Sequence, residues 1–242
     1  MTRFIPIHPR RVLALALAGA SLALAARPLC AQAETPAAPA AADAPAEAAL
    51  PPVEPLDPAT ADPTWQKLFA AVAAHETVFA TFTERRWFSV RKQPVLLRGE
   101  LRHSREHGLS LRYTEPEEQM MIIDARGILL RNAAGRSRAL KTDPRAPQID
   151  AMLLHVLRFD LAALHERFEI RAARSDTQWR LEFVPRTADL ARALGRLTVA
   201  GADEAVRYLE FSRGPKQRVE VLIEEARTGV EFTPEDLRRF FR

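Results

Sequence analysis

The sequence predicts an α+β fold that is mainly antiparallel β: a curled sheet of about ten or eleven strands, with helices lidding its concave face. Short runs rich in β-branched and aromatic residues recur at a spacing of about 8 to 12 residues, separated by turn signals. Several runs alternate apolar and polar residues, which is typical of strands with one face in water. Segments with helical spacing precede, interrupt and follow the strands. Because so wide a sheet usually curls or closes, helices on one side would cover its concave face.

The first 33 residues have the features of a cleavable secretory signal peptide. Arg3, Arg10 and Arg11 precede the apolar run VLALALAGASLALAA, and the small residues AQA stand at positions 31–33. The run is shorter than the ~20 apolar residues that a membrane-spanning helix needs. Arg10-Arg11 also leaves twin-arginine export open beside the general secretory route. We therefore expect an exported protein that resides in the periplasm.

Cysteine use and charge narrow the function classes further. The only cysteine, Cys30, lies before the expected cleavage site, and the preceding RPL is unlike a lipoprotein signal. The mature protein is therefore expected to contain no disulfide and no lipid anchor. Four of the 35 Lys and Arg residues belong to the signal peptide, so the mature chain has 31 basic and 31 acidic residues. This balance, together with export, argues against a nucleic-acid partner.

The remaining chain divides at about residue 64. Residues 34–63 are rich in Ala and Pro, acidic, and free of aromatic residues. Such a segment buries too little apolar surface to offset the entropy lost on ordering, so it predicts a flexible linker. Residues 64–242 are long enough for one globular domain with a single core.

The domain begins with a helical pattern and continues with strands. Apolar residues recur at helical spacing from Trp65 to Phe82, which predicts an amphipathic helix. Strand-like runs follow at 85–92, 95–103, 109–114, 119–124 and 127–132.

The second half repeats this order. Helical spacing returns at 144–158 and 160–168, and a short helix is expected at 188–194. Strand-like runs lie at 167–174, 178–186, 195–200, 206–212 and 218–226. A last helix begins at Thr233 as N-cap, with Pro234 first and Asp236 completing a capping box.

Motifs of common enzymes are absent from the sequence. It contains no G-x-S-x-G elbow, no Walker loop, no G-x-G-x-x-G and no recognisable acid/base motif. We expect no catalytic residues and no cofactor, although an enzyme site assembled from distant residues stays open.

The stretch GELRHSREHGLSLRYTEP, residues 99–116, contains two histidines four residues apart. In a strand, His103 and His107 would lie about 13 Å apart, at roughly 3.3 Å per residue. Zinc–nitrogen bonds are about 2 Å long, so the pair does not readily hold one ion. We therefore predict no metal site and expect both histidines to be solvated at a strand end.

Two segments together resemble the periplasmic lipoprotein-carrier family LolA and its LolA-like relatives. VFATFTERR, residues 78–86, is similar to the family pattern F-x-A-x-F-x-Q, with Glu84 in place of Gln. GELRHSREHGLSLRYTEPEEQMMIID then matches the family landmarks in order, at Gly99, Leu101, Arg105, Tyr113, Pro116, Gln119 and Asp124. The chain departs from the pattern at Glu106, where the family has Pro, at Leu111, where Trp is typical, and at the DARG turn.

The resemblance implies an incomplete β-barrel with a helical lid and a non-catalytic function. Such a carrier shields the acyl chains of lipoproteins in an apolar cavity. It receives them from an inner-membrane ABC transporter of the LolCDE type and passes them to an outer-membrane acceptor of the LolB type, as a monomer. Arg105 corresponds to the family arginine that bonds the barrel to the lid.

Leu109, Leu111 and Tyr113 share one strand face and are candidates for lining the cavity, and Met121 and Ile123 join them. Ordinary core packing of these five residues stays open as an alternative. So do three other functions: a LolA-like carrier of a non-lipoprotein acyl or polyene lipid, an acyl-processing enzyme of the envelope, and a structural envelope-binding module.

Overall fold

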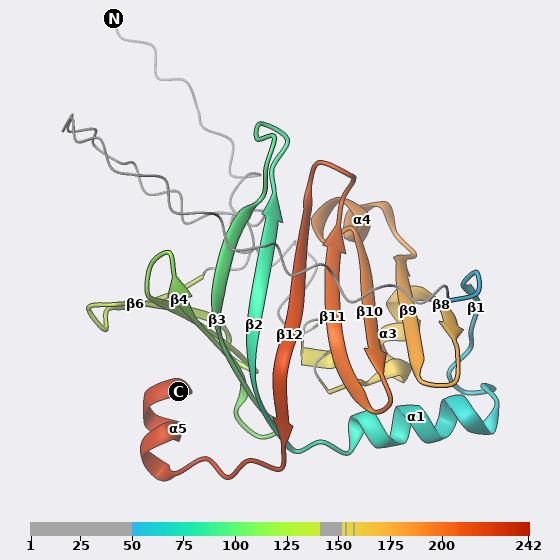
Figure 1. The fold of residues 1–242 in the computed structure, drawn as a ribbon, viewed down its shortest axis with the longest axis horizontal. Helices are drawn as coiled ribbons and strands as arrows, with labels where there is room; N and C mark the ends of the chain where they lie inside the picture. Colours follow the sequence, from blue (N-terminus) through green and yellow to red (C-terminus); the bar gives the residue numbers. More distant parts are fainter. Residues whose placement is uncertain (1–49, 141–151, 153, 157) are drawn as a thin grey trace, which may run out of the picture. The chain divides into compact units, whose positions relative to one another are not determined.

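Antiparallel strands dominate the computed structural model, which describes residues 50–140, 152, 154–156 and 158–242 (Figure 1). In these residues twelve strands form a single sheet. They are β1 (Glu54–Pro55), β2 (Thr77–Trp87), β3 (Val95–Ser104), β4 (Gly108–Glu115), β5 (Gln119–Asp124), β6 (Gly127–Asn132), β7 (Ser137–Ala139), β8 (Phe168–Arg174), β9 (Gln178–Pro185), β10 (Arg196–Ala202), β11 (Ala205–Ser212) and β12 (Arg218–Thr228).

The sheet joins two meanders. Its order is β1-β8-β9-β10-β11-β12-β2-β3-β4-β5-β6-β7, so β12 and β2, each 11 residues long, pair at the junction. The edge strands β1 and β7 have no pairing with each other in the described part, and the sheet is not closed into a barrel. The predicted fold class is therefore confirmed. The strands beyond the predicted number are the short β1 and β7, of two and three residues.

Register divides the side chains between an inner and an outer face. Ala80, Phe82, Glu84 and Arg86 of β2 are buried on one face, and the residues between them point the other way. Because directly paired residues share a face, this assignment extends from strand to strand across the sheet. We call the face that carries Phe82 the inner face and the opposite one the outer face.

Helix α1 (Pro63–Ala73) packs on the inner face. It is capped by Asp62, whose carboxylate accepts from the backbone N–H groups of Thr64 and Trp65 at 2.8 and 3.2 Å. Its apolar stripe contacts the sheet through aromatic rings. The ring centroids of Phe69 and Phe159 are 6.1 Å apart, and those of Phe159 and Trp179 of β9 are 5.9 Å apart.

The prediction that the first helix runs to Phe82 is wrong. Helix α1 ends at Ala73, and Phe79 and Phe82 belong to β2. Their spacing of three residues fits a helix, but in the strand it places them on opposite faces. Phe79 lies under Arg102 and Arg227 on the outer face, with guanidinium–ring distances of 4.9 and 4.8 Å.

The second half contains α3 (Leu161–Arg167) and α4 (Ala188–Ala193), which match the expected helical segments. Most of the helix expected at 144–158 lies outside the described residues; Met152 and 154–156 are helical. Among the described residues, no helix is long and apolar enough to cross a membrane.

Helix α5 (Pro234–Phe240) begins with the predicted capping box. Thr233 Oγ1 accepts from the Asp236 backbone at 3.1 Å, and the Asp236 carboxylate accepts from the Thr233 backbone at 3.0 Å. The helix packs on the outer face, where the Cζ of Arg102 lies over the Phe240 ring, 3.6 Å from its centroid. Beyond it, Arg242 donates to both carboxylate oxygens of Asp124 at 2.6 and 2.7 Å, which holds the chain to the β5–β6 turn.

Ordered structure begins before residue 64. Glu54 and Pro55 form β1 and pair with Ala172 and Arg171 of β8, and the Leu56 N–H donates to the Ile170 carbonyl at 2.9 Å. Part of the Ala/Pro-rich segment 34–63 is thus an edge strand of the sheet, while residues 34–49 lie outside the described residues.

Candidate functional site

The five side chains predicted to line a cavity lie together on the inner face. Register pairs Leu109 with Ile123 and Leu111 with Met121, and Tyr113 follows two residues further along β4. Four of them are buried and Leu111 is half-buried. The alternation seen in the sequence therefore identified a shared face correctly.

One part of the inner face is tightly packed. It comprises β8, β9 and β10 beneath the aromatic residues of α1, and its six central side chains are at most 2% exposed. These are Phe168, Ile170, Leu181, Phe183, Leu197 and Val199. This region is an ordinary core, and it anchors one end of the sheet.

The neighbouring part of the inner face is apolar but less tightly covered. On β11 and β12, five inward side chains are only half-buried. We call them the apolar inner patch: Leu209, Phe211, Val219, Val221 and Ile223. Their direction follows from register, because Val221 pairs with Leu209 and Ile223 pairs with Phe82.

The apolar inner patch was missed at the sequence level. The C-terminal half resembles the LolA family in strand pattern more than in residues, so no landmark pointed to these positions. The alternation in VEVLI, residues 219–223, does place Val219, Val221 and Ile223 on one face. That signal was available, but alternation alone does not distinguish a filled core from an accessible surface.

Arg105 connects the β3–β4 turn to the end of α1. Its guanidinium donates to the Ala73 carbonyl, the last residue of that helix, and its Nε lies 3.0 Å from a Glu76 carboxylate oxygen. The Arg105 backbone N–H also donates to the Glu76 carbonyl at 2.8 Å. On its other side, the Arg158 guanidinium donates to the Arg105 carbonyl at 3.4 Å. Arg105 therefore holds the sheet to the end of the inner-face helix.

The two histidines have different surroundings. His103 is on the inner face and only 7% exposed, so the expectation of a solvated residue is wrong for it. Burial, followed by the nearby charges of Arg105 and Arg158, lowers the pKa of His103 to about 4. His107 is half-buried in the turn, with its ring 5.8 Å from that of Phe241. In the described part of the chain, no group of three His, Cys, Asp or Glu side chains is placed to hold a metal ion.

A polar cluster lies on the inner face beside the apolar inner patch. It consists of Glu84, Arg86 and Tyr113, which are 3%, 7% and 2% exposed. Arg86 Nε donates to Glu84 Oε1 at 2.5 Å and its Nη2 to the Tyr113 hydroxyl at 3.2 Å, while that hydroxyl donates to Glu84 Oε2 at 2.8 Å. The three groups therefore form a closed triangle, which we call the inner polar cluster.

The inner polar cluster also changes the acidity of its members. Burial raises the pKa of the Tyr113 hydroxyl, and the adjacent Glu84 carboxylate raises it further. Burial alone would lower the pKa of Arg86, but the charges and hydrogen bonds of Glu84 and Tyr113 together outweigh burial and raise this pKa. Both shifts favour the protonated forms, so Arg86 keeps its positive charge and Tyr113 keeps its phenolic proton at neutral pH.

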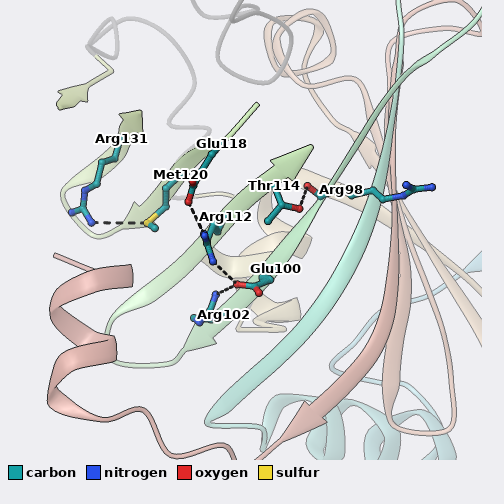
Figure 2. Close-up of polar contacts among 8 residues, drawn as sticks. All are labelled: Arg98, Glu100, Arg102, Arg112, Thr114, Glu118, Met120 and Arg131. Atoms are coloured by element: carbon teal, nitrogen blue, oxygen red, sulfur yellow. Dashed lines mark hydrogen bonds and ion pairs between the residues drawn. The ribbon is translucent and has the colours of Figure 1, made fainter. Parts of the chain in front are cut away.

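The outer face of β3 and β4 is polar by contrast. Figure 2 shows Glu100 between Arg102 and Arg112, at 2.9 and 3.5 Å, with Arg112 also bonded to Glu118 at 2.7 Å. These side chains are partly exposed. Their ion pairs replace hydrogen bonds to water and therefore contribute little to the free energy of unfolding. The two faces of the same strands therefore differ in kind: charged outside and mainly apolar inside.

Comparison with known proteins identifies relatives at the level of a family. A family model described as "Outer membrane lipoprotein carrier protein LolA-like" matches residues 56–235. A search of curated proteins found no match to the chain.

Three solved structures resemble the chain at low identity. A LolA superfamily protein from Nitrosomonas europaea has a TM-score of 0.39 and 10% identity, covering 73% of this chain and 97% of that one. An outer membrane lipoprotein-sorting protein domain from Vibrio parahaemolyticus has a TM-score of 0.42 and 9% identity, covering 72% and 94%. A DUF1329 family protein from Desulfovibrio piger has a TM-score of 0.38 and 8% identity, covering 72% and 96%. These identities are too low to carry a cargo or a partner over to this chain.

Proposed function

Because the chain belongs to the LolA-like outer membrane lipoprotein carrier family, we propose that it is a non-catalytic carrier that holds acyl chains against the inner face of its sheet. The proposed cargo is the acylated end of lipoproteins. The proposed site is the apolar inner patch together with Leu109, Leu111, Tyr113, Met121 and Ile123.

The observation that carries this proposal is the incomplete covering of an apolar face. Side chains of the patch point inward yet stay half-buried, next to a packed core on β8 to β10. Burying each CH₂ group of an acyl chain is worth about 0.8 kcal/mol, so one chain of about fourteen such groups gains on the order of 10 kcal/mol. An apolar inner face of this kind is what such cargo requires.

A carrier must also release its cargo, and Arg105 supports a way to do so. Its bond to the Ala73 carbonyl and its contact with Glu76 hold the end of α1. A hydrogen bond from a charged donor contributes about 1.5 to 3 kcal/mol, which is small enough to break during transfer. We propose that separation of α1 from Arg105 opens the inner face.

Family membership supports the proposed location and partners. We propose that the protein acts in the periplasm, taking cargo from an inner-membrane transporter of the LolCDE type and passing it to an outer-membrane acceptor of the LolB type. Both exchanges are carried by binding and release, with no bond made or broken.

Matched substitutions on the two faces test the site. Val221→Asp places a charge in the apolar inner patch, and Val184→Asp places the same charge on the outer face, where Val184 is also half-buried and pairs with Glu169. Affinity for a pyrene-labelled fatty acid methyl ester, measured by fluorescence titration, should fall at least tenfold in Val221→Asp and change less than twofold in Val184→Asp. Equal losses in the two variants would contradict an inner-face site.

A further inference from the structure

We infer that the inner polar cluster of Glu84, Arg86 and Tyr113 selects cargo by the charge of its polar end. It accepts an uncharged ester or amide and rejects a free carboxylate. This inference rests on the proposed function, because it names the class of acyl compound that the same face would hold.

The cluster is placed where the polar end of a bound chain would lie. Glu84 pairs with Val221 on one side and with Leu97 on the other, and Arg86 pairs with Val219 and Val95. Val219 and Val221 belong to the apolar inner patch. An acyl chain lying along that patch therefore has the cluster as its polar neighbour on the same face.

The charges of the cluster are balanced within it. Arg86 and Glu84 neutralise each other at 2.5 Å, and the Tyr113 hydroxyl bonds both. A carboxylate brought to this site would meet the Glu84 charge in a poorly hydrated environment, where like-charge repulsion is strong. It would also have to lose its own water without gaining an unpaired cation.

An ester or amide carbonyl meets neither obstacle. Of the Arg86 nitrogens, Nε donates to Glu84 and Nη2 donates to Tyr113, and these two bonds do not use Nη1. A guanidinium carries five N–H donors, so Nη1 has hydrogens left for a carbonyl oxygen. A neutral acceptor can take that bond without disturbing the pair of charges.

The test compares a pyrene-labelled hexadecanoic acid with its methyl ester at pH 8, on the full chain. Glu84→Gln keeps the shape and the acceptor oxygen but leaves Arg86 as an unpaired cation. We expect the ratio of acid affinity to ester affinity to rise at least tenfold in this variant. Glu220→Gln is the matched control, because Glu220 is also buried, 8% exposed, and paired with an arginine two residues away, but on the outer face. Its ratio should stay within twofold of wild type.

Arg86→Met supplies a second test of opposite sign. It leaves the Glu84 carboxylate unpaired, so affinity for a pyrene-labelled alkylamine should rise at least tenfold relative to the methyl ester. Circular dichroism spectra establish that each variant is folded. If Glu84→Gln does not fold, the alkylamine measurement on Arg86→Met tests whether the cluster selects cargo by charge. If neither variant folds, the cluster serves stability alone and the inference is overturned.

The outcomes separate this inference from the proposed function. If both probes bind and their ratio is the same in wild type and Glu84→Gln, the cluster does not select cargo, while the carrier proposal stands. If neither probe binds any folded variant or wild type, the carrier proposal itself fails.

Discussion

The Tyr113 hydroxyl donates a hydrogen bond to the Glu84 carboxylate at 2.8 Å, which joins β4 to β2 across the intervening β3. The Phe82 ring stands edge-on to Tyr113, with ring centroids 5.4 Å apart. Polar and aromatic contacts of the same tyrosine thus hold the middle of the inner face in one arrangement.

Loss of this hydroxyl should destabilise the fold measurably. Tyr113→Phe leaves Glu84 and Arg86 each without one buried partner, at a cost of about 1 to 3 kcal/mol. Tyr208→Phe is the control, since the Tyr208 hydroxyl donates to Glu210 at 2.6 Å on the half-buried outer face, where water can replace it. Urea unfolding should show the larger loss for Tyr113→Phe. A loss no greater than that of Tyr208→Phe would show that the triangle contributes little.

Arg105→Leu should speed cargo release while leaving the protein folded. Removing its charged hydrogen bond to Ala73 weakens the hold on α1 by about 1.5 to 3 kcal/mol. The dissociation rate of a bound pyrene-labelled fatty acid methyl ester, followed by stopped-flow fluorescence, should therefore rise roughly tenfold or more. Arg98→Leu is the control, because the Arg98 guanidinium pairs with the exposed Glu115 on the outer face. An unchanged rate in Arg105→Leu would exclude it from the release step.

Gly99→Ala should destabilise the sheet because the space beside Gly99 is filled. A Cβ there would lie 2.2 Å from the Arg112 carbonyl oxygen and 2.9 Å from Cζ of Phe82. Overpacking of this kind costs about 1 to 3 kcal/mol or more. In Gly135→Ala the added carbon meets nothing within 4 Å, so only the strain of its φ of 74° remains. Thermal unfolding that ranks Gly135→Ala as the more damaging change would contradict the packing around Gly99.

Because of His103, the free energy of unfolding should decrease as the pH is lowered. The folded-state pKa of His103, about 4, lies below the ordinary value of 6.5, so the unfolded chain takes up a proton first as the pH is lowered. The contribution is fully present above pH 6.5 and is lost toward pH 4, and the loss amounts to about 2 kcal/mol by pH 5.

Urea unfolding at pH 7 and pH 5 checks this dependence. His103→Gln should lose about 2 kcal/mol less of its free energy of unfolding than wild type between the two pH values. A His103→Gln variant with the wild-type pH dependence would show that His103 is not the group responsible.

The fold was predictable where local rules determine it. Alternation in β3 to β6 and β8 to β12 identified strands within a few residues, and the capping box at Thr233 located α5. The short edge strands β1 and β7 were missed, because two or three residues carry no period. The end of α1 was missed since Phe79 and Phe82 fit a helix and a strand equally well.

The candidate site was predictable only in part. Alternation placed Leu109, Leu111 and Tyr113 on one face, and register brought Met121 and Ile123 beside them. Glu84 was visible only as a departure from the family pattern, because its partner Tyr113 lies 29 residues away and pairing at that distance depends on strand register. Nothing in the sequence tells how fully helices cover the inner face.

Identifying the molecules that the protein holds in the cell shows whether its inner face carries acyl chains. The protein would be purified without detergent from the periplasm of cells that produce it, and native mass spectrometry would identify the bound species. We expect an acylated species in near-stoichiometric amount: a triacylated Cys-peptide for lipoprotein cargo, or an acyl lipid for the alternative carrier. Folded protein that carries no acylated species, together with turnover of acyl esters, would contradict it.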